Sequence, residues 1–115
     1  MITIYHNPRC SKSREGLQVV KESQKEFAIH KYLEETLSIK ELTDLIQKLG
    51  IKPIELVRKN ETIWKEKFKH KQLTDSEIIS AMVSFPKLIE RPIVVFKDKA
   101  VIGRPTEHIT TLINH

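Results

Sequence analysis

The chain contains one cysteine, Cys10, within the stretch His6-Asn-Pro-Arg-Cys-Ser-Lys-Ser-Arg14. Cysteine attacks other groups as the thiolate, and nearby positive charge and hydrogen-bond donors favour that form. Arg14 supplies such a charge, and the hydroxyls of Ser11 and Ser13 can donate hydrogen bonds to the sulfur. We therefore interpret Cys10 as a nucleophile, although a lone cysteine without this context is usually a small buried apolar residue.

The elements expected around Cys10 strengthen this interpretation. Residues 2–5 have the β-branched and aromatic composition of a short buried strand, and Pro8 ends it because proline restricts the preceding residue to extended conformations. A helix then starts near Cys10 or Ser11 and runs to about Ser23. The first turn of a helix has unpartnered N–H groups that favour an anion. We expect the pKa of Cys10 to lie below the ~8.5 of a free thiol.

The histidines offer one possible partner and no metal site. His6 is either a charge or proton partner of Cys10 or a solvent-exposed residue at the strand end, and the sequence leaves both open. The five histidines show no i,i+4 pair and no tight cluster with cysteine: His6, His30, His70, His108 and His115. We expect no bound metal and no other bound cofactor.

Ser13 occupies the position at which a C-x-x-C motif would have its second thiol. The chain therefore cannot resolve a covalent intermediate at Cys10 through its own disulfide. If it carries out redox turnover, a thiol from another molecule must complete each cycle.

The pattern along the whole chain predicts a single domain over residues 1–115. Strand, helix and strand within the first 32 residues form a βαβ unit with a right-handed crossover. A mostly helical insertion follows at about 36–88, and a β-hairpin and a last helix end the chain. The predicted elements are a strand at 27–32, helices opened by capping boxes at Ser38 and Thr74, a short helix at 53–57, a polar segment around Trp64, strands at 92–96 and 100–102, and a helix opening at Pro105. Gly16 weakens the first helix, which indicates that close packing requires a small residue there.

Composition limits the partners. The formal net charge is +5, but basic and acidic residues are mixed along most of the chain, so we expect no nucleic-acid binding and, at most, attraction of a small anion. No segment approaches the ~20 apolar residues of a membrane span, and the first residues lack the pattern of a signal peptide. With one cysteine, we expect the reducing cytoplasm as its location. Nothing in the sequence demands an oligomer, so we expect a monomer.

Four segments together carry a family resemblance. Tyr5–Arg14, Leu56–Asn60, Glu90–Val95 and Ile102–Pro105 resemble the motifs of the glutaredoxin-linked arsenate reductase family, in the same order and at matching spacing. The resemblance implies an α/β, thioredoxin-like fold with a mixed four-stranded sheet and a helical insertion. It also implies that the cysteine attacks arsenate, that glutathione attacks the adduct, and that glutaredoxin takes up the resulting disulfide as arsenite leaves.

By motif match, the resemblance places three arginines in the oxyanion site: Arg58, Arg91 and Arg104. A guanidinium offers two parallel donors to an oxyanion, which suits arsenate and its transition state. Each arginine can also be interpreted as a surface ion-pair member. The resemblance further implies a cis peptide bond before Pro92, facing the cysteine. From their positions around Cys10, we expect supporting roles for His6, Ser13 and Arg14.

Two other functions remain open at this point. One is a regulator resembling the Spx family, which shares this fold and binds RNA polymerase; many of those proteins have a C-x-x-C switch, and Ser13 argues against it. The other is a glutathione-dependent thiol transferase. The three arginines favour the oxyanion reductase, because a protein disulfide does not explain them.

Overall fold

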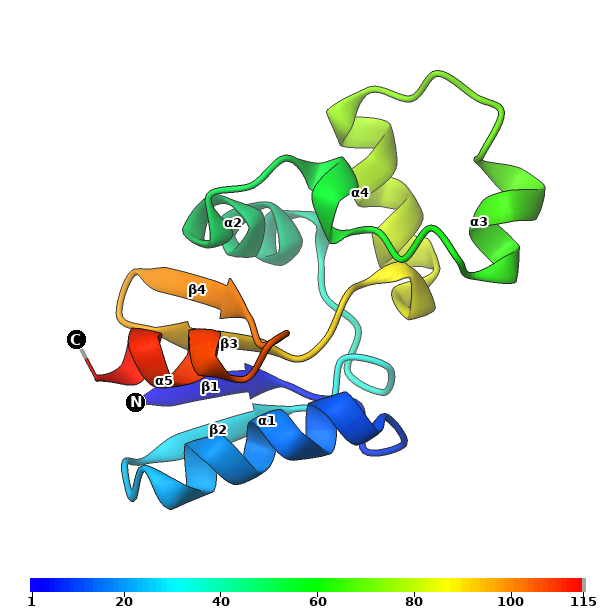
Figure 1. Cartoon of the computed structure of the whole chain (residues 1–115). Helices are drawn as coiled ribbons and strands as arrows, with labels where there is room; N and C mark the ends of the chain where they lie inside the picture. Colours follow the sequence, from blue (N-terminus) through cyan, green and yellow to red (C-terminus); the bar gives the residue numbers. More distant parts are fainter. Residues whose placement is uncertain (115) are drawn as a thin grey trace. The chain divides into compact units, whose positions relative to one another are not determined.

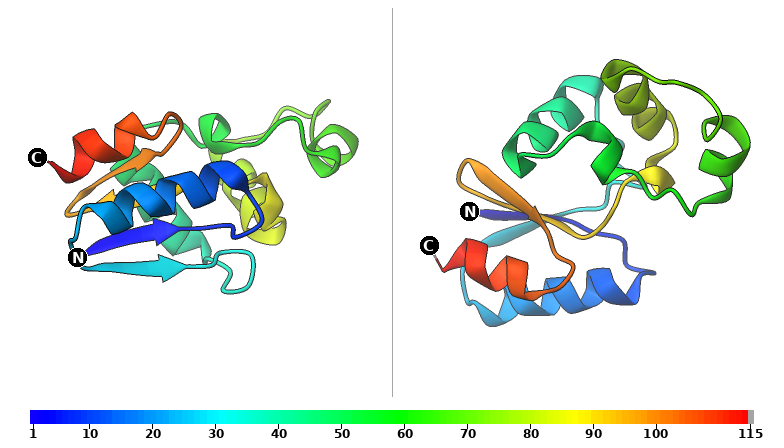
Figure 2. Two further views of the ribbon diagram at one scale, coloured as in Figure 1. Left: turned by 60° about the horizontal axis from the view of Figure 1, so that its bottom comes forward. Right: turned by 45° about the horizontal axis from the view of Figure 1, so that its top comes forward.

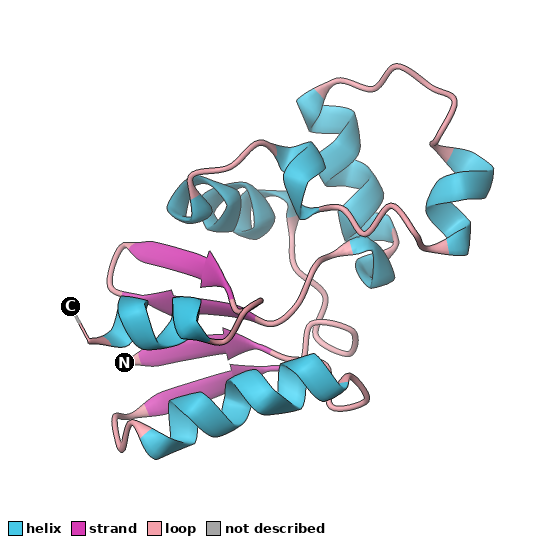
Figure 3. Ribbon diagram, in the orientation of Figure 1, coloured by secondary structure: helices cyan, strands magenta, loops and turns pink. Residues whose placement is uncertain are grey.

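The computed structural model describes residues 1–114. By internal contacts the chain divides into two compact units: unit 1, residues 1–35 and 91–115, and unit 2, residues 36–90. Figure 3 shows that the strands belong to unit 1, whereas unit 2 consists of helices and loops. The helical insertion expected at about 36–88 falls within unit 2; the assignment of the whole chain to one domain stays a prediction.

Unit 1 is built on a mixed sheet with the strand order β2-β1-β3-β4 (Figure 1). β1 pairs in parallel with β2 and antiparallel with β3, and β3 pairs antiparallel with β4. Within residues 1–114 the strands are β1 Ile2–Tyr5, β2 Phe27–His30, β3 Ile93–Phe96 and β4 Lys99–Ile102. The predicted mixed four-stranded sheet and its βαβ…ββα order are confirmed.

Two helices, α1 Ser11–Glu22 and α5 Glu107–Ile113, cover one face of this sheet, as the views in Figure 2 show. Their apolar side chains meet those of the strands in one core: Ile2, Ile4, Val20, Val94, Ile109, Leu112 and Ile113. Strand alternation directs Ile2 and Ile4 to the same face. This core holds α1 and α5 against the sheet.

Unit 2 follows local sequence signals closely. Both predicted capping boxes form, Ser38 with Glu41 and Thr74 with Glu77, and Gly50 ends its helix in the left-handed region with φ 67°. The elements of the unit are α2 Ile39–Leu49, η1 Pro53–Leu56, α3 Thr62–Lys67, α4 Asp75–Ser84 and η2 Pro86–Leu88.

Three local predictions differ from the structure. The segment around Trp64 is the helix α3, because Trp64 packs inward and is buried. Pro105 does not open the last helix: α5 begins at Glu107, two residues later. β2 ends at His30 and not at residue 32, where the chain turns away from the sheet. No helix within residues 1–114 has the length and apolarity needed to span a membrane.

Candidate active site

Cys10 is the N-cap residue of α1, at the point where the chain turns from β1 into the helix. Its own N–H donates to the carbonyl oxygen of Asn7 at 3.0 Å, which closes the tight turn through Asn7-Pro8. Its backbone is extended, with φ −97° and ψ 123°, and its carbonyl accepts the first helical hydrogen bond, from Arg14. The thiol therefore lies beside the first-turn N–H groups, as the sequence predicts, with 9% of its residue surface exposed.

The surroundings of Cys10 favour the thiolate. Burial raises the pKa of the thiol, but this is outweighed by the N–H group of Ser13, the charge and hydrogen bonding of Arg91 and the N–H group of Lys12, so the pKa lies below its ordinary value. The thiol forms no side-chain cap hydrogen bond with the helix. The N–H groups of Ser13 and Lys12 and the guanidinium of Arg91 instead favour its deprotonated form.

Ser13 acts on this site through its backbone and supports it through its hydroxyl. The Oγ atom lies 2.6 Å from Nδ1 of His6 and accepts a hydrogen bond from the N–H of Asn7 at 3.0 Å. The hydroxyl contacts in the structure are thus with the loop, and it is the N–H group that favours the Cys10 thiolate. Ser13 is fully buried, so it ties the end of β1 to α1.

His6 is buried, with 5% of its surface exposed, so the expectation of a solvent-exposed histidine is wrong. Burial lowers its pKa, and the positive charges of three neighbours lower it further, Lys31, Arg14 and Lys21. A histidine whose pKa falls below 6.5 is neutral near pH 7. His6 therefore acts as a neutral hydrogen-bonding partner of Ser13, and the alternative of a positively charged partner of Cys10 is not supported.

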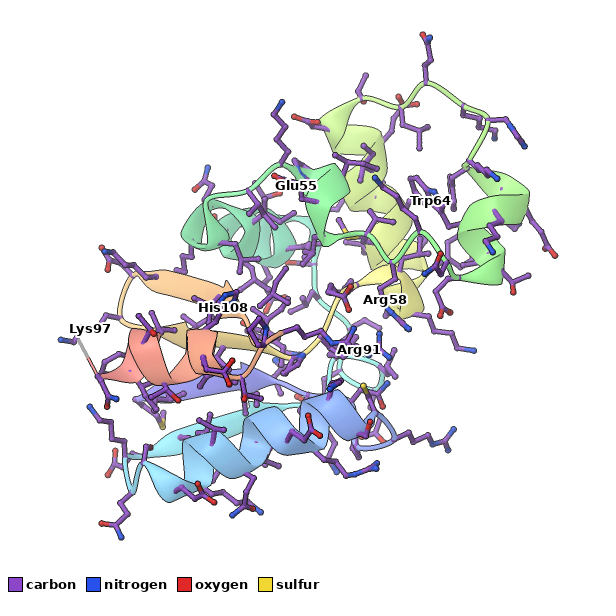
Figure 4. All side chains as sticks on the ribbon, viewed as in Figure 1. Glu55, Arg58, Trp64, Arg91, Lys97 and His108 are labelled. Carbon is purple, nitrogen blue, oxygen red and sulfur yellow. The ribbon has the colours of Figure 1, made fainter. Side chains whose placement is uncertain are left out.

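Arg91 lies in the loop before β3, from which Pro92 separates it (Figure 4), and it is the arginine that the structure brings to Cys10. It is buried, with 9% of its surface exposed, so it is not the surface residue that the alternative interpretation describes. The Arg91-Pro92 peptide bond is cis, which confirms that expectation; Arg104-Pro105 is also cis, which was not predicted.

Pro92 is the link between Arg91 and the helix that carries Cys10. A Cβ atom at Gly16 would lie 2.7 Å from Cγ of Pro92, and one at Gly103 would lie 3.1 Å from the same atom. The N–H of Gly103 also donates to the carbonyl oxygen of Pro92 at 2.8 Å. The expectation that Gly16 is small for packing is confirmed, and its partner is the residue next to Arg91.

The remaining predicted residues of unit 1 lie at its surface. Arg14 is exposed, and its Nη1 donates to the carbonyl oxygen of Pro8 at 2.9 Å, so it braces the turn before Cys10. Arg104 is exposed and lines a hollow of ≈ 360 Å³ together with Lys12 of the first turn of α1. Arg104 thus reaches the same end of α1, and its role in oxyanion binding stays a prediction.

Arg58 belongs to unit 2 and is held by acidic neighbours. Its Nη1 lies 3.1 Å from a carboxylate oxygen of Glu61, and its Nε lies 3.9 Å from one of Glu90. The ion-pair interpretation therefore describes Arg58 correctly, and its part in oxyanion binding stays a prediction.

Sequence reasoning missed two contributors to this site. One is the N–H of Lys12 in the first turn of α1, and the other is the hydrogen bond from the N–H of Gly103 to the carbonyl oxygen of Pro92. Within residues 1–114 no three His, Cys, Asp or Glu side chains gather in a way that could hold a metal ion. His115 lies outside the described residues.

The fold, together with a thiol of lowered pKa at a strand-to-helix turn, defines a thioredoxin-like protein with a single reactive cysteine. The family model of the ArsC family matches residues 5–112. The chain belongs to the ArsC family, which confirms the resemblance seen in its motifs.

Individual relatives agree with this family. The chain is 45% identical to YfgD of Escherichia coli K12, described as an uncharacterized protein, over 97% of this chain and 96% of that protein. It is 37% identical to the arsenate reductase of Haemophilus influenzae, over 97% of this chain and 98% of that protein. The structure of arsenate reductase from Vibrio cholerae matches with a TM-score of 0.91 at 42% identity, covering 96% of this chain and 95% of that one.

Proposed function

We propose that this protein is an oxidoreductase that reduces arsenate to arsenite, with Cys10 as its nucleophile and an external thiol as its reductant. The observation that carries this proposal is the set of donors around the Cys10 sulfur: two backbone N–H groups and the Arg91 guanidinium lower its pKa. The ArsC family relatives named arsenate reductase support the choice of oxyanion.

The proposed reaction balances with two thiols. The Cys10 thiolate forms a sulfur–arsenic bond as an arsenate oxygen leaves with protons as water. Glutathione then supplies the second thiolate; a Cys10–glutathione disulfide forms, the sulfur–arsenic bond breaks, and its electron pair stays on arsenic as As(III). Arsenic gains two electrons and the two sulfurs lose one each. Because Ser13 stands where a resolving cysteine would be, glutaredoxin removes the glutathione from Cys10.

The arginines have distinct parts in this proposal. Arg91 contacts both the thiolate and the incoming oxyanion, since it already lies against the sulfur. Arg104 and Arg58 complete the oxyanion site as the family resemblance implies. His6, Ser13 and Pro92 position the loop and strand around these groups. No metal or other resident cofactor takes part, and we place the protein in the cytoplasm as a monomer that binds neither nucleic acid nor membrane.

A coupled assay tests the proposal. Purified protein is mixed with glutathione, glutaredoxin, glutathione reductase and NADPH, and NADPH oxidation is followed after addition of arsenate or phosphate. We expect arsenate-dependent oxidation that phosphate does not support and that Cys10→Ser abolishes. Oxidised wild-type protein should gain the mass of one glutathione.

Two results would count against the reductase. Efficient turnover without any small thiol or glutaredoxin would contradict the role given to glutathione. Absence of arsenate turnover together with capture of RNA polymerase in a pulldown would favour the regulator.

A further inference from the structure

Unit 2 contains a hollow that the chemistry of Cys10 does not use. It has a volume of ≈ 660 Å³ and lies between α3, the loop after α3 and the start of α4. Its apolar lining comprises Ile54, Trp64, Phe68, Leu73 and Ile78. Trp64 projects from α3 toward α4 (Figure 4), and the rest of the apolar lining comes from η1, the loop after α3 and α4. A hollow of this size accepts a large apolar side chain of another molecule.

The rim of this hollow is strongly basic. Its charged lining residues are one aspartate, Asp75, and four lysines: Lys59, Lys65, Lys69 and Lys71. Residues 59–71 contain five lysines and two glutamates, so they concentrate positive charge within a chain of net charge +5. In the described part of the chain none of these four lysines forms a salt bridge. Lys71 acts electrostatically on Glu77, which lines the adjoining hollow, whereas Lys59, Lys65 and Lys69 present their charge to an anionic molecule.

The apolar surface continues beyond this first hollow. A second hollow of ≈ 440 Å³ shares Phe68, Lys71 and Leu73 with the first and reaches Phe85. The rings of Trp64, Phe68 and Phe85 form a row, with centroids 5.5 Å apart for the first pair and 6.0 Å apart for the second. Two adjoining hollows suit an extended segment with more than one apolar side chain.

We propose that these two hollows of unit 2, the lysine-rimmed groove, bind an acidic segment of a protein partner. Its aromatic or leucine side chains fill the hollows, and its aspartates and glutamates face the lysines. A peptide fits better than a nucleic acid, since bases stack on open aromatic faces, whereas Trp64 has only 7% of its surface exposed. The groove is thus an interaction surface, and this inference does not depend on what Cys10 reduces.

Trp64 is the only tryptophan of the chain, so its fluorescence reports on this groove alone. The full-length protein is titrated with the amidated, acetylated peptide Glu-Asp-Phe-Glu-Asp-Leu-Glu, and a peptide with lysine in place of every acidic residue is the control probe. We expect a saturable change in Trp64 emission with the acidic peptide, protection of Trp64 from acrylamide quenching, and weaker binding at higher salt. The lysine peptide should produce none of these.

Charge-reversal variants locate the binding. The double variant Lys65→Glu, Lys69→Glu should bind the acidic peptide about tenfold more weakly or worse, because two attractive charge interactions become repulsive. The matched control is Lys97→Glu with Lys99→Glu, which makes the same change of net charge in the β3–β4 hairpin of unit 1. That control should retain binding within about twofold. Circular dichroism melting checks both variants for folding; if the groove variant does not fold, the salt dependence and the two peptides still decide the outcome with wild-type protein.

Several outcomes would overturn the proposal. These are no saturable emission change, equal binding of the acidic and lysine peptides, or equal weakening by both charge-reversal variants. Tighter binding of a single-stranded oligothymidylate than of the acidic peptide would assign the groove to nucleic acid instead.

Discussion

The two units place their arginines in opposite situations. In unit 1, Arg91 is buried beside a thiol and lowers its pKa, so its charge is directed at a reactive group. In unit 2, Arg58 lies between Glu61 and Glu90, so its charge is balanced by carboxylates of its own unit. The motifs around both residues resemble the same family pattern. A motif match therefore indicates the position of an arginine in the fold. Whether that arginine can bind an anion depends on the side chains that already surround its guanidinium.

The units also differ in how they organise backbone donors. In unit 2, Ser38 and Thr74 use their own oxygens to satisfy the first turns of their helices. In unit 1, the first turn of α1 has a sulfur at the same position and no complete cap hydrogen bond. The donors of α1 therefore remain available for an anion, whereas those of the unit 2 helices stabilise the fold.

Replacement of the sulfur gives the largest expected effect. Cys10→Ser should reduce arsenate-dependent NADPH oxidation to the background rate, because a serine hydroxyl cannot form the adduct or the mixed disulfide. The melting temperature should change little, since a serine at an N-cap is favourable for the helix. Residual activity above background in the variant would place the nucleophile elsewhere.

The two arginines can be compared directly by the same substitution. Arg91→Lys should lower kcat/KM by about 30-fold or more, because a lysine supplies one point charge where a guanidinium supplies two parallel donors. Arg104→Lys should act in the same direction, and its exposed position predicts an unchanged melting temperature. For Arg91, burial predicts some loss of stability as well.

Arg58→Lys is the matched control from unit 2. Its two carboxylate partners can still pair with a lysine, so we expect a smaller loss than for Arg91→Lys, measured in the same assay. Equal losses for both substitutions would remove the distinction between the two arginines. Near-normal activity of both Arg91→Lys and Arg104→Lys would show that the oxyanion site lies elsewhere. It would favour the alternative function, a regulator that binds RNA polymerase.

Two glycines, one in each unit, distinguish close packing from backbone conformation as the reason for a glycine. Gly16→Ala places a Cβ atom 2.7 Å from Pro92, so the free energy of unfolding should fall by about 1–2 kcal/mol, and the thiol of Cys10 should become less reactive as Pro92 and Arg91 shift. Gly50→Ala has open space but a positive φ of 67°, so it should cost about 1 kcal/mol and leave the thiol unchanged. Urea unfolding and alkylation rates measure both quantities, and a change of thiol reactivity in Gly50→Ala would contradict this separation.

The pH dependence of alkylation gives the smallest expected effect. The pKa of Cys10 lies below its ordinary value, and the thiolate is the reactive form. The rate of reaction with iodoacetamide should therefore rise with pH and reach half its maximum below ~8.5, the pKa of a free thiol. Arg91→Lys should move this midpoint upward, and Arg58→Lys should leave it in place. A wild-type midpoint at the free-thiol value would contradict the effect assigned to the helix start.

Local patterns predicted the elements that local interactions determine. The capping boxes at Ser38 and Thr74 and the strand at residues 2–5 required no knowledge of distant residues, and they are present. The helix at Trp64 was missed because its stability comes from the packing of one large side chain and not from a capping pattern. The late start of α5 was missed because Pro105 resembles a helix start from sequence alone.

The candidate site was predicted in part for the same reason. The position of Cys10 at a helix start follows from neighbouring residues, whereas its contact with Arg91 joins distant segments and came from the family resemblance. The pKa of His6 is lowered by its burial and by the charges of residues as far along the chain as Lys31. Such tertiary effects leave no pattern in the nine residues around the cysteine.

The central strand pairing of unit 1 has a consequence for synthesis on the ribosome. β1 lies between β2 and β3, and its pairing with β3 brings Ile2 opposite Phe96, from opposite ends of the chain. Unit 2 is continuous, so all its residues emerge before β3 does. Contacts between distant segments form slowly, and domains complete from the N-terminus as chains emerge. The thiol of a nascent chain therefore has the N–H groups of Ser13 and Lys12 within its own helix early, whereas the contribution of Arg91 is added only after unit 2 has emerged.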